Sequence, residues 1–113
     1  MTDQLEFPFQ RMDAYREAKA LARAVHHAKV RHAELRDQAE RAAISVFLQL
    51  SEGLPDDRPA MRKRYFTTAR NSLCEVVAAI DLAESLAVIA PDAATAIATH
   101  ATRVRAMLIA LLR

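Results

Sequence analysis

The stretch at residues 38–53, QAERAAISVFLQLSEG, carries the clearest helical pattern and holds the only glycine of the 113 residues. Its apolar residues recur at spacings of three and four, as on one face of an α-helix: Ala39, Ala42, Ala43, Val46 and Leu50. A second line with the same spacing is polar: Gln38, Arg41, Ser45, Gln49 and Glu52. This pattern predicts a helix with a buried stripe beside a polar one. We expect Gly53 to end it in the left-handed conformation.

Composition favours an all-α fold. One Gly and four Pro offer few turns, while the helix-favouring residues Ala, Leu, Arg and Glu are abundant. Hydrophobic residues make up 52% of the chain, which excludes a disordered protein and is enough for one core. We predict one domain over residues 1–113, with a tail at 1–11.

Three breaks divide the pattern into four helices, expected at about residues 12–31, 34–53, 59–88 and 93–112. A continuous helix over the first two segments would be ~60 Å long, so we expect a turn near residues 29–34. Pro59 suits the first turn of the third helix, and Asp92 is a candidate N-cap of the fourth. Such short connections predict an antiparallel, up-down-up-down four-helix bundle.

Two apolar segments point to contacts beyond a single bundle. Phe7 and Phe9 in the tail are expected to anchor it on the body or on a neighbour, the alternative being a recognition arm. The run at residues 106–112, AMLIALL, is apolar on nearly all sides, which predicts a surface for a second copy. We therefore expect a homo-oligomer.

Charge, cysteine count and segment hydropathy limit the location and the partners. The net charge is +2, which alone does not imply nucleic acid. A single cysteine, Cys74, excludes an internal disulfide and suggests a reducing compartment. The first ten residues lack the pattern of a signal peptide, and no membrane-spanning run occurs. We expect a cytoplasmic protein without a membrane partner.

Basic residues gather in two places that could hold the phosphates of RNA or DNA. The alternative is ordinary solvated surface charge. The first cluster surrounds the start of the third helix, and the second lies on the first helix: Arg58, Arg62, Lys63, Arg64 and Arg70, then Arg16, Lys19 and Arg23.

The polar line on the second helix predicts a seam with the third helix. Its members are Gln38, Arg41, Ser45 and Glu52, facing Ser72 and Glu75. We expect Arg41 to form a buried, charge-assisted pair with a carboxylate. The alternatives are a seam that lines a pore or ligand site, and a stripe that faces solvent.

No motif indicates catalysis, a metal or a cofactor. Glu52 and Glu75 could act as an acid/base pair, but the Glu-x-x-His of ferritin-like metal bundles is missing. His26, His27 and His32 do not have zinc-ligand spacing. A nucleophilic triad and a P-loop are also missing. A metal-binding or catalytic bundle is therefore the least favoured hypothesis.

Several of these residues form a family motif. The resemblance rests on Gln38, Arg41, Ala42, Ala43, Ser45, Ser51, Glu52, Gly53, Ala69, Ser72 and Glu75. The family pattern usually reads R-A-x-S-I-x-x-N-I-A-E-G, followed later by A-x-G-S-x-x-E. This chain has Gln49 in place of the Asn, Leu50 in place of the Ile, Ser51 in place of the Ala, and Asn71 in place of the Gly. The chain resembles the four-helix-bundle family linked to intervening sequences in bacterial 23S ribosomal RNA genes. The accessory variability protein of diversity-generating retroelements is a relative of that family.

The resemblance implies a bundle that assembles into rings, with a pentamer as the expected form and without enzymatic activity. Its retroelement relatives bind nucleic acid and a reverse transcriptase through basic surfaces. We therefore expect a non-enzymatic oligomeric scaffold that binds nucleic acid. The alternative is a scaffold that docks a protein partner only.

Overall fold

The computed structural model describes residues 7–113, and regular structure within them is helical throughout. A 3-10 turn, η2 (Pro8–Arg11), precedes the helices α1 (Asp13–Ala28), α2 (Ala33–Gly53), α3 (Pro59–Ser85) and α4 (Pro91–Leu111). The prediction of four helices is confirmed, as is the turn between the first two, at residues 29–32. The first six residues of the predicted tail lie outside the described part.

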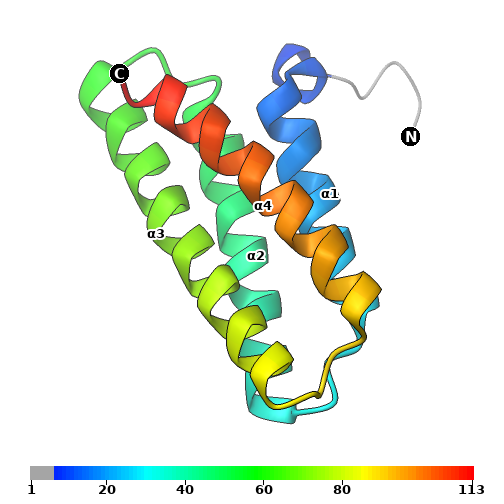
Figure 1. The fold of residues 1–113 in the computed structure, drawn as a ribbon. Helices are drawn as coiled ribbons and strands as arrows, with labels where there is room; N and C mark the ends of the chain where they lie inside the picture. The colour runs from blue at the N-terminus through cyan, green and yellow to red at the C-terminus, as the bar shows by residue number, and fades with distance from the viewer. Residues whose placement is uncertain (1–6) are drawn as a thin grey trace.

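The helices surround a single core (Figure 1). Contacts join α1 with α2, α2 with α3, α3 with α4, and α4 with α1. The α1–α2 and α3–α4 connections lie at one end of the bundle. The α2–α3 connection lies at the other end, near the C-terminus. The longest helix, α3, has 27 residues and an expected length of about 40 Å, close to the 43 Å long dimension of the fold.

The core is built from the predicted apolar stripes. The large side chains with less than 2% exposure come from all four helices and one turn: Phe66, Leu21, Leu50, Ile97, Leu108, Val25, Val30, Val46, Val76 and Val104. Alanines such as Ala18, Ala39 and Ala69 are fully buried between them, which lets the helix backbones approach closely. Burial of these stripes supplies the main driving force for folding.

The two connections at one end of the bundle are hydrogen-bonded to each other. The backbone N–H of Arg31 donates to the carbonyl of Val88 at 2.8 Å, and its guanidinium donates to the carbonyl of Ala87 at 3.0 Å. Lys29 and Ala87, which follow the ends of α1 and α3, have φ of 49° and 56°. These two residues therefore occupy the left-handed conformation in which glycine is usually found.

Gly53 does end α2, but the expectation of a left-handed conformation is wrong. Within residues 7–113 no glycine has positive φ, and Gly53 is the last helical residue. It is required for space, because a Cβ built on it would lie 2.7 Å from Cε1 of Phe66. The N-cap assignment of Asp92 is also wrong. Pro91 already occupies the first turn, so Ala90 is the N-cap and Asp92 is an acidic first-turn residue.

The described part of the tail is held by aromatic contacts. The Phe7 ring stacks on Phe9 at 6.1 Å between centroids, and Phe9 meets Tyr15 edge-on at 5.6 Å. Tyr15 in turn contacts Phe47 of α2 at 5.0 Å. Phe9 therefore acts as the expected anchor, whereas Phe7 remains 62% exposed.

Candidate functional site

Arg58 and Asp56 form a closed pair in the turn before α3. The guanidinium of Arg58 donates to both carboxylate oxygens of Asp56, at 3.0 and 2.8 Å, and its backbone N–H donates to Oδ1. These hydrogen bonds from Arg58 lower the pKa of the Asp56 carboxyl to about 2. The guanidinium of Arg58 is therefore already paired with a carboxylate of the same chain.

Arg62 also has a structural contact. Its Nη1 donates to the carbonyl of Leu54 at 2.8 Å and to that of Gly53 at 3.4 Å, and its guanidinium lies 5.0 Å from the centre of the Phe66 ring. The cation thus satisfies carbonyls that the end of α2 leaves without helical partners. Two members of the predicted basic cluster, Arg58 and Arg62, therefore stabilise the α2–α3 turn.

The remaining predicted cations are available on the surface. Lys63, Arg64 and Arg70 of α3 are exposed, as are Arg16, Lys19 and Arg23 of α1. Within residues 7–113 none of these six forms an ion pair; Lys19 lies 5.0 Å from the Tyr15 ring centre. Both helices begin at the same end of the bundle (Figure 1). Five of these cations lie in the halves of α1 and α3 nearer that end, whereas Arg23 lies in the second half of α1. The two helices are diagonal in the bundle.

Charge is strongly segregated along α3 and α4. Residues 58–70 contain five Lys or Arg and neither Asp nor Glu, whereas residues 75–92 contain four Asp or Glu and neither Lys nor Arg. Arg103 and Arg105 lie in the C-terminal half of α4, and Arg113 follows the end of that helix. The start of α3 and the end of α4 are at the same end of the bundle (Figure 1). In a chain with net charge +2, α3 and α4 therefore form a basic end of the bundle, beside the Asp56 and Asp57 of the α2–α3 connection.

The polar seam is present only in part. Ser45 and Ser72 share a hydrogen bond of 2.7 Å between α2 and α3, and Gln38 is half-buried. Arg41, Glu52 and Glu75 are exposed, so the expected buried Arg41–carboxylate pair is wrong. The hydroxyls fit because they are small and satisfy each other, whereas a buried charge would need a full set of partners.

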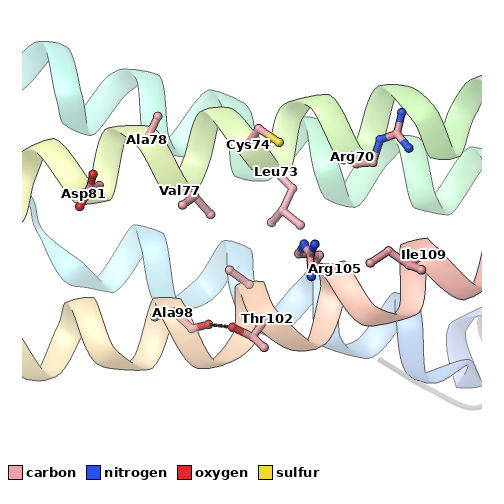
Figure 2. Close-up of a pocket in the computed structure, with 11 residues that line it drawn as sticks. Arg70, Leu73, Cys74, Val77, Ala78, Asp81, Ala98, Thr102, Arg105 and Ile109 are labelled. Atoms are coloured by element: carbon pink, nitrogen blue, oxygen red, sulfur yellow. Dashed lines mark hydrogen bonds between the residues drawn. The ribbon is translucent and has the colours of Figure 1, made fainter.

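A groove lies on the outer side of α3 and α4 (Figure 2). It has a volume of about 740 Å³, and its floor is formed by small and apolar side chains that include Leu73, Val77, Ala98 and Ala101. Charged residues mark its ends. Arg70 and Arg105 lie toward one end and Asp81 toward the other. The groove is mostly apolar and open to solvent.

The apolar C-terminal run contributes less surface than expected. Leu108 is buried, Met107, Leu111 and Leu112 pack partly against the core, and Ile109 is 40% exposed beside the groove. Two apolar residues on α2 are more exposed than Ile109: Ile44 and Leu48 are each 52% exposed. Sequence reasoning missed this pair, although its spacing of four residues, away from the buried stripe, was a usable signal.

Glu17 is the centre of a polar contact between α1 and α4. Its carboxylate is 2.5 Å from Nδ1 of His100 and 3.6 Å from Arg103.

No group of three or more His, Cys, Asp or Glu in the described chain could hold a metal ion. Every buried side-chain polar atom there has a hydrogen-bond partner. None of the described helices combines the length and the apolar character needed to cross a membrane.

Comparison with known proteins identifies the lineage. A search of curated proteins finds no match. A family model described as 23S rRNA-intervening sequence protein matches residues 10–110, which span all four helices. The match agrees with the motif that joins α2 and α3. The chain therefore belongs to the 23S rRNA-intervening sequence protein family.

Proposed function

We propose that this protein is a non-enzymatic, cytoplasmic adaptor that assembles with itself and binds the backbone of RNA or DNA at the basic end of the bundle. In this proposal the bundle has antiparallel, up-down-up-down order and forms a ring, for which five subunits is the number that the family resemblance implies. The unpaired Cys74 is consistent with a reducing compartment.

The observation that carries the proposal is the charge segregation along α3. Overall charge would attract a polyanion only weakly, but a polyanion responds to the local field. At the start of α3, Lys63 and Arg64 are exposed, and no Asp or Glu occurs from residue 58 to residue 70. Arg16, Lys19 and Arg23 form a second exposed positive surface on α1.

Assembly would multiply this field. Each phosphate that a cation neutralises releases counterions. On duplex DNA, the plot of the logarithm of the binding constant against the logarithm of the salt concentration therefore has a slope of about −0.9 for each such contact. One pair of cations gives a weak interaction, whereas several copies on one particle give many simultaneous contacts. Lysine and arginine contacts of this kind hold the backbone without reading the base sequence.

Binding of the purified protein to RNA and DNA at about 50 mM salt tests the proposal. We expect the Lys63→Glu/Arg64→Glu variant to lose most of this binding, because it reverses two exposed charges. The exchange variant Lys63→Arg/Arg64→Lys is the matched control, since it keeps both charges and should bind like the wild type. If the wild type is not retained, or if charge reversal has no effect, a scaffold that docks only proteins becomes the better account.

A further inference from the structure

Two surfaces of the chain complement each other, and both are exposed to solvent in a single molecule. The first, here called the α2 stripe, consists of the exposed residues Arg41, Ile44, Leu48 and Glu52. The second is the groove between α3 and α4. We propose that the groove receives the α2 stripe of a second copy of this chain. This inference rests on the proposed self-assembly and assigns the surfaces that carry it.

The charges at the ends of the two surfaces fix the direction of the contact. Arg41 and Glu52 are separated by eleven residues on α2, and so are Arg70 and Asp81 on α3. Both intervals are about 16 Å along a helix. When the incoming α2 runs opposite to α3, Arg41 meets Asp81, while Glu52 meets Arg70 and its groove neighbour Arg105. The reverse direction would place like charges together at both ends.

The same alignment matches the central side chains. Ile44 then faces Ala78, and Leu48 faces Cys74 beside Val77. Ala78 and Cys74 are small and exposed, so they leave room for the two larger side chains. Ala98 and Ala101 on the α4 side let a third helix approach closely. The apolar centre would remove Ile44, Leu48 and Val77 from water, and these are among the most exposed apolar residues of the described chain.

The contact is heterologous because each copy contributes a different surface. An open row of subunits keeps one free stripe at one end and one free groove at the other. The contacts therefore either close into a ring or continue as an open filament. Arg70 then belongs to the interface between copies, and Lys63 and Arg64 remain for a polyanion. The alignment also accounts for the exposed Arg41 and Glu52, neither of which forms an ion pair within residues 7–113.

Site-directed disulfide formation tests the alignment, because Leu48 is expected to face the native Cys74. Under a mild oxidant such as diamide, Leu48→Cys should give a ladder of covalent dimers and larger species on a non-reducing gel. The ladder should vanish in Leu48→Cys/Cys74→Ser. The matched control is Arg23→Cys, an exposed position on α1, which should give no ladder. Since a disulfide requires Cα atoms within about 7 Å, misaligned helices would not react.

Complementation tests whether the contact is heterologous. Ile44→Arg damages only the stripe and Val77→Arg only the groove, and both positions are half exposed, so folding should be retained. Each variant alone should be monomeric by light scattering, whereas their mixture should form a heterodimer through the one intact pair of surfaces. A wild-type protein that is itself monomeric would overturn the proposed self-assembly and this inference together. An assembled wild type whose variants also assemble, without a Cys74-dependent ladder, would overturn this inference alone.

Discussion

Gly53 of α2 and Phe66 of α3 pack so closely that no space remains between them for a methyl group. A Cβ on Gly53 would lie 2.7 Å from Cε1 and 3.0 Å from Cδ1 of the Phe66 ring. The ring is fully buried and has little freedom to move aside. The single glycine of the chain is therefore fixed by helix packing at the site where α2 ends.

Gly53→Ala should destabilise the protein by about 1–2 kcal/mol, because the clash outweighs the better helix propensity of alanine. Urea unfolding at a fixed protein concentration measures the change. In a Phe66→Leu background the same substitution should cost less, since the clashing ring atoms are gone. A Gly53→Ala variant as stable as the wild type would show that the ring can yield.

Ala87→Gly should have the opposite effect. Ala87 has a φ of 56°, a conformation that is strained for alanine but not for glycine. We expect about 0.5–1 kcal/mol of added stability, because relief of this strain exceeds the entropy that glycine gains in the unfolded chain. Thermal unfolding of the two proteins side by side is sufficient, and a lower midpoint for the variant would contradict the assignment.

The sequence predicted the helices well because their stripes repeat along the chain. Pro59 begins α3 as expected, and the stripe of Ala39, Ala42 and Leu50 is buried. The role of Gly53 could not be predicted, since it depends on a ring thirteen residues away in another helix. Local patterns report the backbone period, whereas a close approach between helices depends on tertiary packing.

Arg62→Ala should destabilise the fold by about 1–2 kcal/mol, even though Arg62 lies in a sequence of surface cations. Its guanidinium hydrogen-bonds the carbonyls of Gly53 and Leu54 at the end of α2, and charged hydrogen bonds of this kind are stronger than neutral ones. Arg64→Ala is the control and should change the unfolding free energy by less than about 0.5 kcal/mol. Equal effects of the two substitutions would rule out a specific role for Arg62.

The stability contribution of Asp56 should depend on pH. Its pKa is lowered to about 2 in the folded protein from an ordinary value of 3.8, so the ionised form is favoured by folding. The contribution is therefore fully present above about pH 4 and is lost as the pH falls through 2. Asp56→Asn should be less stable than the wild type at pH 7, and the difference should shrink as the pH is lowered below 4. A difference that stays constant from pH 7 to pH 2.5 would contradict the assignment.

The candidate site was predictable in part. Local charge density in the sequence pointed to the cations Lys63 and Arg64, which are exposed. It could not show that neighbouring Arg58 and Arg62 make hydrogen bonds in the α2–α3 turn. The polar stripe of α2 correctly indicated Ser45, which meets Ser72, but the pattern could not distinguish a buried charge pair from an exposed one. That distinction depends on the rotation of α2 relative to α3, which a helical period alone leaves open.

The salt dependence of nucleic-acid binding by the assembled wild-type protein is the most direct test of the central claim. Binding to a short DNA duplex is measured from about 50 to 200 mM salt, and the logarithm of affinity is plotted against the logarithm of salt concentration. The account predicts a slope steeper than about −2, because more than one Lys63–Arg64 pair would contact phosphates at once. A slope near zero, or no binding at 50 mM salt, would contradict it.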